Sequence, residues 1–411
     1  MVGSYLRLRF SVSSICQHMS LYLFFFATLC GAVISQRPRL LSIDEVSSPL
    51  RNGRPEETIT SAIGDLEHIQ TLEVWSRSYA PGLPVTSLLV DPTGTKLIGT
   101  VATGFRQYDL LYTTWFVVEA RVSTLSLARF VSFELQPTGG DRYSVPRATL
   151  YPMFPSRGNV VHFVTEMGLA VPGIYRGGDQ EELIVTFSEG DGYSLPREPS
   201  IQRFPSGFKS TATTRLEMPD ITRACPANTS IVGRPDIPLG TGPTAITTLN
   251  QRRRLRGSLL MFCDRPSPDP SIPKTDPQAD VHLGLLYDGK NLARFHIESN
   301  DGFAPLNVAE LNNGDVMIVF DRYFGDSIRI GYVTYRQLRR SGIRGRTLKP
   351  LIIAELSRSD GYNIRSGGSI AVRYDRSRRR TFVYIGTYDH STRHTWLTSF
   401  EWKAKRGRSR R

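Results

Sequence analysis

The sequence is poor in cysteine and in long apolar runs, and each shortage excludes a class of protein. Only four cysteines occur in 411 residues, which excludes a scaffold held together mainly by disulfides. Beyond the first 40 residues there is no uncharged apolar stretch of about 18 residues, which excludes a polytopic membrane protein. Hydrophobic residues still make up 40% of the chain and aromatic residues 10%, so the chain can build a large core and is not wholly disordered.

Several signatures of catalysis are also missing. The chain has no Gly-x-Ser-x-Gly elbow of a serine hydrolase, no glycine-rich phosphate-binding loop and no Cys-x-x-Cys pair. His390 and His394 are four residues apart beside Asp389. In a strand or loop this spacing does not place both histidines on one helical face, and no third ligand is obvious. We therefore interpret the two histidines as chance neighbours rather than a metal site.

The amino terminus is free of acidic residues and carries an apolar segment. Arg7 and Arg9 precede an apolar run from Leu21 to Ile34, and Ser35 offers a small residue for cleavage. This pattern predicts a secretory signal peptide over residues 1–35. A retained signal anchor is a less favoured alternative because the run is short for a membrane span, and the dense Leu and Phe disfavour a mitochondrial presequence. We therefore expect the protein to be secreted or to lie in the lumen of the secretory pathway.

Two cysteines remain after the leader, Cys225 and Cys263. In an oxidising compartment they can form one disulfide, and two buried free thiols are an equally acceptable interpretation. Asn228 begins an Asn-Thr-Ser sequon, which predicts a glycosylation site.

The formal charge of +13 is concentrated at the carboxyl terminus. The last nine residues, 403–411, hold six cations and no acid, and they are predicted to be a basic disordered tail able to contact an anionic surface or acidic partner. Two further clusters, 252–256 and 376–380, fall between apolar runs and are interpreted as solvated turn residues. No aromatic-interleaved motif accompanies the clusters, so the pattern predicts no specific nucleic-acid binding.

Short β-rich runs bounded by Gly, Pro, Asn or Asp dominate the chain, and no segment of 12 residues has helical periodicity. Only Tyr335 to Arg340 is expected to form one or two helical turns. The pattern therefore predicts an all-β fold.

One unit recurs along the chain: a strand of small residues, a polar turn and a strongly apolar strand. The first strands begin near residues 86, 168, 244, 306 and 369. Radial repetition of such hairpins predicts a β-propeller. We expect six blades, because the first interval is long enough for an additional degenerate blade, with five or seven as alternatives. Closure of the ring is predicted to pair residues 69–75 with 396–402.

These features divide the chain into four parts: a signal peptide (1–35), an N-terminal linker (36–65), the propeller (66–402) and the basic tail (403–411).

Several motifs resemble the phytase-like β-propellers described as having esterase-like activity of phytase. Near the C-terminus, residues 368–372 (Gly-Ser-Ile-Ala-Val), 387–391 (Thr-Tyr-Asp-His-Ser) and 394–398 (His-Thr-Trp-Leu-Thr) are similar to three consecutive family motifs. Upstream, residues 313–324 are similar to the family's D-G-x-L-L-V-L-E-R-S-F segment, and residues 188–204 to its S-S-E-G-D and P-S-I-x-R-F pair. The resemblance covers roughly residues 81–402.

The resemblance implies a ring of carboxylates that holds Ca²⁺ near the central channel and, through it, a phosphate ester. Acids that match this pattern stand at or just beyond the ends of second strands: Glu189, Asp191, Asp264, Asp321 and Asp389. Where the family has a glutamate near the start of the inner strand, this chain has Met167, Thr244, Asn307 and Gly368. One acidic layer is thus kept and another lost. The surviving acids can instead have structural uses, such as accepting backbone hydrogen bonds or pairing with a neighbouring arginine.

Two functions follow from this pattern. The first is a divergent Ca²⁺-dependent phosphoester or ester hydrolase with a partly eroded acidic site. The alternative is a catalytically inactive propeller that acts as a binding or scaffold module. The expected partner is an anionic small-molecule ester or a protein, and the chain is expected to be a monomer.

Overall fold

The fold is seen in a computed structural model of the 411-residue chain. The described residues are 39–46, 58–75, 85–113, 116–153, 167–189, 198–209, 214–215, 225, 227–228, 239–240, 243–274, 276–322, 325–364, 366–389 and 394–405. Over part of these ranges, including 39–46, 102–113 and 116–128, only the backbone is described. The predicted signal peptide and Asp191 lie outside the described residues.

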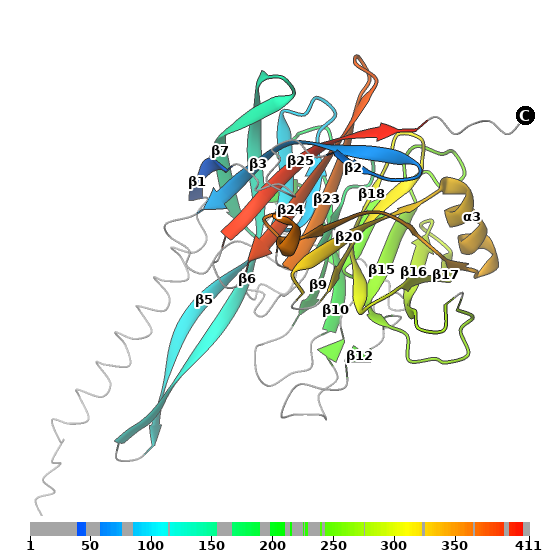
Figure 1. The fold of residues 1–411 in the computed structure, drawn as a ribbon. Helices are drawn as coiled ribbons and strands as arrows, with labels where there is room; N and C mark the ends of the chain where they lie inside the picture. The colour runs from blue at the N-terminus through cyan, green and yellow to red at the C-terminus, as the bar shows by residue number, and fades with distance from the viewer. Residues whose placement is uncertain are drawn as a thin grey trace, which may run out of the picture.

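Five antiparallel blades form the ring of a β-propeller (Figure 1). Blade 1 comprises β4 (Val85–Val90), β5 (Lys96–Thr113), β6 (Phe116–Gly139) and β7 (Arg142–Pro152). Blade 2 comprises β8 (Gly168–Ala170), β9 (Leu183–Glu189), β10 (Glu198–Phe204) and β11 (Thr214–Arg215). Blade 3 comprises β14 (Ala245–Thr248), β15 (Leu259–Pro266), β16 (Asp280–Tyr287), β17 (Leu292–Ser299) and the short parallel β21 (Thr347–Leu348).

The last two blades complete the ring. Blade 4 comprises β18 (Phe303–Glu310), β19 (Val316–Arg322), β20 (Ser327–Val333) and β22 (Leu351–Ser357). Blade 5 comprises β23 (Ser366–Asp375), β24 (Arg380–Asp389), β25 (His394–Ala404), β3 (Gly64–Trp75) and the short β2 (Thr58–Thr60). The inner strands contact one another in the order β4, β8, β14, β18, β23 and back to β4. All five hairpins predicted from the sequence are therefore confirmed as the inner halves of blades.

The preferred count of six blades is not confirmed, because the structure has five. The long first interval that suggested an additional blade is occupied largely by β5 and β6. These two strands pair along all of β5, from Lys96–Glu134 to Thr113–Phe116. Figure 1 shows this hairpin projecting well beyond the body of the molecule. The additional residues therefore lengthen two strands of blade 1 rather than forming another blade.

The ring closes where strands from opposite ends of the chain meet. β25 pairs with β3, with Trp402 opposite Leu66 and Thr395 opposite Val74, which confirms the predicted closure. Strand β1 (Arg39–Val46) extends the sheet further, because it pairs with β3 of blade 5 and with β7 of blade 1. Residues 39–46 and 58–60, expected to be linker, are thus strands. Lys403 and Ala404, expected to begin the tail, belong to β25.

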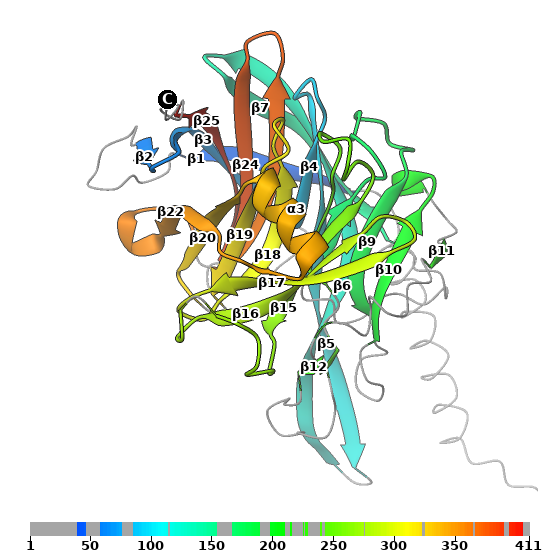
Figure 2. The same cartoon turned by 90° about the vertical axis from the view of Figure 1, so that its right-hand side faces the viewer.

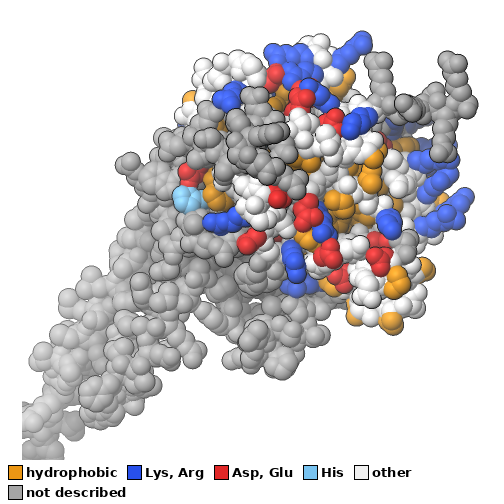
Figure 3. Space-filling model, viewed as in Figure 1, with side chains coloured by type: hydrophobic (Ala, Val, Ile, Leu, Met, Phe, Trp, Pro, Cys, Tyr) orange, Lys and Arg blue, Asp and Glu red, His pale blue; other side chains and the backbone are white. Residues whose placement is uncertain are grey.

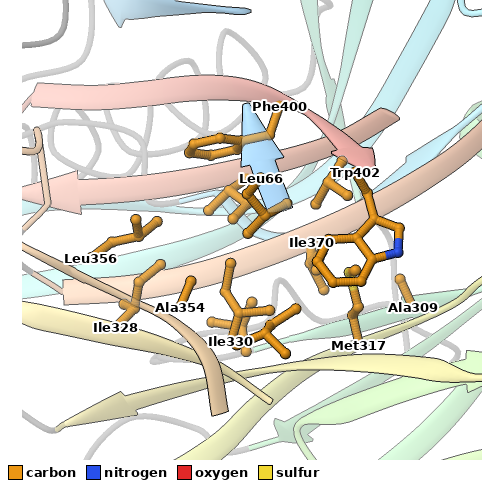
Figure 4. Packing of buried hydrophobic residues seen from close by; sticks show 14 of the residues in the cluster. Leu66, Ala309, Met317, Ile328, Ile330, Ala354, Leu356, Ile370, Phe400 and Trp402 are labelled. Carbon is orange, nitrogen blue, oxygen red and sulfur yellow. The ribbon is translucent and has the colours of Figure 1, made fainter. Parts of the chain in front are cut away.

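The hydrophobic core is divided into five clusters, one between each pair of neighbouring blades. Figure 4 shows the cluster between blades 4 and 5, where Ile330 and Met317 face Ile370 and Phe400. Each strand buries side chains against a neighbouring blade as well as its own, so burial of apolar area fixes the blades relative to one another.

One α-helix, α3 (Tyr335–Arg344), occurs among the described residues and lies outside the ring, against β17 (Figure 2). Thr334 caps it by accepting a hydrogen bond from the backbone N–H of Gln337, and Gly345 ends it with φ of 62°. The helical turns expected from Tyr335 onward are confirmed, and the helix is longer than expected. No helix in the described part of the chain has the length and apolar character needed to cross a bilayer.

Candidate functional site

Four of the five predicted site acids lie near the carboxyl ends of second strands, on β9, β15, β19 and β24. In a propeller the second strands of all blades run in the same direction, so their ends meet at one mouth of the central channel. The side chains of Asp264 and Asp321 are described. For Glu189 and Asp389 only the backbone is described.

Asp321 links two blades at this mouth. Its Oδ2 accepts a hydrogen bond of 2.9 Å from the backbone N–H of Gly367 in β23. Gly367 has φ of 75°, a left-handed conformation that favours glycine at this position. Oδ1 of Asp321 is buried and has no hydrogen-bond partner among the described residues. Burial raises the pKa of Asp321 to about 7, although backbone hydrogen bonds from Gly367 and Arg322 oppose this rise.

The raised pKa of Asp321 predicts a pH dependence of stability. The folded chain keeps this carboxyl protonated up to about pH 7, whereas the unfolded chain releases the proton near 3.8. The contribution of Asp321 to stability is therefore fully present below the unfolded pKa and is lost as the pH rises through 7. Asparagine does not titrate, so Asp321→Asn should not lose this contribution. When the pH is raised from about 5 to about 8, we expect the unfolding free energy of the variant to increase relative to that of the parent chain by on the order of 2 kcal/mol. Urea unfolding at both pH values measures the gain.

The matched control for this experiment is Asp288→Asn. Asp288 lies in a surface turn, where hydrogen bonds from Asn291 and Lys290 lower its pKa. The control variant is therefore expected to show no gain relative to the parent chain as the pH rises. An Asp321→Asn variant whose stability follows that of the parent chain at both pH values would contradict the raised pKa.

Asp264 has a more ordinary setting. It is half-buried at the end of β15, and its Oδ2 lies 3.6 Å from Nε of Arg265. It directly follows Cys263, which forms a disulfide with Cys225 (Cα–Cα 5.5 Å) in the core between blades 2 and 3. Pairing with a neighbouring arginine is the structural use that the sequence left open for these acids.

Calcium in proteins takes six to eight oxygen ligands, so one carboxylate is not enough. Among the residues with described side chains, no three of His, Cys, Asp or Glu lie close enough to hold a metal ion. The described side chains therefore do not fit the calcium site that the family resemblance implies.

The inner ring at this level is neutral and closely packed. Asn307, where the family resemblance implies a glutamate, donates a 3.0 Å hydrogen bond from Nδ2 to the carbonyl oxygen of Thr86 in blade 1. A Cβ on Gly168 would lie 2.5 Å from the carbonyl oxygen of Thr244, so the inner strands of blades 2 and 3 approach without room for a side chain. Thr244, Asn307 and Met167 are themselves buried. Small, amide and thioether groups thus fill the inner ring at these positions.

A buried His–Ser pair in blade 3 was not found from the sequence. His282 Nε2 lies 2.9 Å from Oγ of Ser299, and this hydroxyl donates to the carbonyl oxygen of Phe303. Burial lowers the pKa of His282 to about 4, so the ring is neutral at pH 7. Because both side chains are buried and the serine proton is bound by the backbone, we interpret the pair as structural.

Asn228 lies in the short strand β12 (Ala227–Asn228), which pairs with β13 (Leu239–Gly240). Its side chain is not described, so glycosylation there stays a prediction.

Comparisons with known proteins add little to the geometry. No family model matches the chain, and no curated protein matches it. Its structure is similar to a crystal structure of a protein of unknown function from Dyadobacter fermentans DSM 18053, with 9% sequence identity and a TM-score of 0.37, over 80% of this chain and 96% of that one. The resemblance to phytase-like propellers stays a prediction.

Proposed function

We propose that this protein is a secreted β-propeller that acts as a binding module rather than as a hydrolase. The observation that carries this proposal is the neutral inner ring, in which Asn307 bridges two blades and Gly168 leaves no room for a side chain. The described residues offer no cluster of three metal-ligating groups for catalysis, whereas the faces of a propeller are suited to binding partners. The Cys225–Cys263 disulfide supports secretion, because disulfides persist mainly in oxidising compartments.

The second candidate function is the Ca²⁺-dependent phosphoester hydrolase. One specific observation favours it: Oδ1 of Asp321 is buried without a partner among the described residues, at the mouth that it shares with Glu189, Asp264 and Asp389. A buried carboxylate oxygen without a partner costs free energy, and such a cost is often retained for a ligand.

Calorimetry with CaCl₂ and turnover of p-nitrophenyl phosphate distinguish the two functions. If the protein is a binding module, we expect no saturable heat at about 1 mM Ca²⁺, because the two described carboxylates at this mouth, Asp264 and Asp321, do not supply the six to eight oxygens calcium needs. We also expect the same background hydrolysis from the parent chain and from a Glu189→Ala/Asp321→Ala variant.

The matched control is Glu134→Ala, which removes an exposed carboxylate in blade 1. Saturable calcium binding, together with turnover that the Glu189→Ala/Asp321→Ala variant loses and Glu134→Ala keeps, would overturn the binding-module proposal in favour of the hydrolase.

A further inference from the structure

Two arginine-rich turns that look alike in the sequence have different surroundings. In the turn 376–380, Arg378 binds Asp141 at 2.5 Å, and Arg380 binds both Asp141 and Glu401. In the turn 251–257 between β14 and β15, no arginine forms an ion pair with a described residue. Glu310 interacts electrostatically with Arg252 and Arg256, so the four arginines of this turn face one nearby acid and keep a net positive charge.

Helix α3 adds to this charge. It has no acidic residue, and it buries Leu338 and Ser341 toward the body. Arg336, Arg340 and Arg344 recur every four residues and are all exposed. Like charges at this spacing destabilise a helix, and Arg336 near the N-terminus also opposes the helix dipole. The helix thus carries exposed positive charge at a cost to its own stability.

Specific contacts hold the turn and the helix side by side. The guanidinium of Arg252 lies over the ring of Tyr335, 5.5 Å from its centroid. Asp315 accepts a 2.7 Å hydrogen bond from the backbone N–H of Tyr335 at the start of the helix. Glu310 accepts hydrogen bonds from the backbone N–H groups of Asn250 and Gln251 at the start of the turn. The two nearby acids therefore position the basic segments through backbone groups.

Together these segments form a surface that we call the arginine strip. Its members are Arg252, Arg253, Arg254, Arg256, Arg336, Arg339, Arg340, Arg344 and Arg346. Figure 3 shows Lys and Arg side chains gathered at the edge of the molecule where Figure 1 places α3. The helical part alone extends about 15 Å, so the strip is elongated rather than a single anion pocket.

We propose that the arginine strip binds a linear sulfated polysaccharide. This inference rests on the proposed binding-module function and names its class of partner. All nine cations of the strip are arginine, whose planar guanidinium binds oxyanions through two parallel hydrogen bonds, whereas lysine acts as a point charge. An elongated row of such groups complements a chain that carries oxyanions at intervals.

Two other polyanions fit the strip less well. Single-stranded nucleic acids need aromatic side chains on which bases stack, and Tyr335, the aromatic residue that contacts the strip, is covered by Arg252. A bilayer needs an apolar face to insert, and the helix buries its apolar side in the protein. Ile343, with 72% of its surface exposed, is the one large apolar side chain on the outer face of the helix.

The test uses the full-length protein and heparin as the probe, with binding measured by calorimetry over a range of salt concentrations. We expect an Arg336→Gln/Arg340→Gln/Arg344→Gln variant to bind about 30-fold more weakly at about 0.15 M salt, and the slope of log affinity against log salt to fall by about 2. Glutamine is a good helix former, so α3 should persist, and denaturant unfolding checks that the variant remains as stable as the parent chain. The matched control, Arg376→Gln/Arg378→Gln/Arg379→Gln, removes the same charge from the other turn. Asp141, Asp375 and Glu401 offset the positive charge of that turn, so this variant should bind heparin like the parent chain.

Several outcomes would overturn the proposal: equal weakening by both triple variants, binding of unsulfated hyaluronan as tightly as heparin, or preference for a single-stranded oligonucleotide or phosphatidylserine vesicles. A variant with Arg406, Arg408, Arg410 and Arg411 replaced by glutamine tests the tail. If that variant alone loses binding, the tail is the site and the strip is not. If the arginine strip does not bind heparin, the binding-module function is not contradicted, because calcium binding and turnover test that function separately.

Discussion

Replacing both Cys225 and Cys263 with alanine is expected to lower the free energy of unfolding by about 4 kcal/mol. The disulfide closes a loop with a sequence separation of 38 residues, and a loop of this length restricts the unfolded chain by about that amount. Both cysteines are also buried between blades 2 and 3, so the bond ties the segment before blade 3 to the core. Guanidinium unfolding followed by tryptophan fluorescence measures the change.

The control for this prediction is the reductant itself. The parent chain should unfold at lower guanidinium concentration when the disulfide is reduced, whereas the alanine double variant should be insensitive to reductant. If the parent chain unfolds at the same midpoint with and without reductant, after labelling confirms that both thiols are free, the disulfide does not stabilise the fold.

Ile330→Ala is expected to destabilise the protein by about 2–5 kcal/mol, because it removes a fully buried side chain and leaves a cavity. Ile330 lies in the cluster between blades 4 and 5, close to the closure of the ring (Figure 4). Denaturant unfolding gives the change in the unfolding free energy.

The same substitution at an exposed position is the matched control. Ile343→Ala removes an identical side chain from the outer face of α3, where 72% of its surface is exposed. We expect a change within about 0.5 kcal/mol there, since exposed substitutions rarely matter and alanine favours a helix. Equal destabilisation by the two variants would show that burial of Ile330 between blades 4 and 5 does not contribute to the stability of the fold.

Much of the fold could be predicted because the blade pattern is local. A run of small residues such as Thr86–Val90, a polar turn and an apolar strand is visible in any window of the sequence, and each of the five hairpins has this pattern. Closure between residues 69–75 and 396–402 could also be predicted, because pairing the first and last strands of a ring removes exposed edges. The blade count could not, because interval length does not distinguish an additional blade from the elongated β5–β6 hairpin.

The candidate site was less accessible to sequence analysis. The strand-end position of Asp321 could be read from the sequence, but its unpartnered Oδ1 depends on how β23 of the next blade packs against it. The arginine strip shows the same limit. Both arginine turns were interpreted as solvated, and only the folded chain brings Asp141 to Arg378 while leaving Arg253 without a described acidic partner. Long-range pairing of charges is not encoded in local pattern.

The meeting of β3 and β25 has a consequence for how the protein is made. Thr71 and Thr398, whose hydroxyls lie 3.2 Å apart, are separated by 327 residues. At roughly 5–20 residues per second, a ribosome takes about 20–60 s to supply the second strand after the first. During that delay β3 lacks its final neighbour while blades 1 to 4 are synthesised. Folding helpers that shield unpaired strand edges should therefore act on the nascent chain until translation ends.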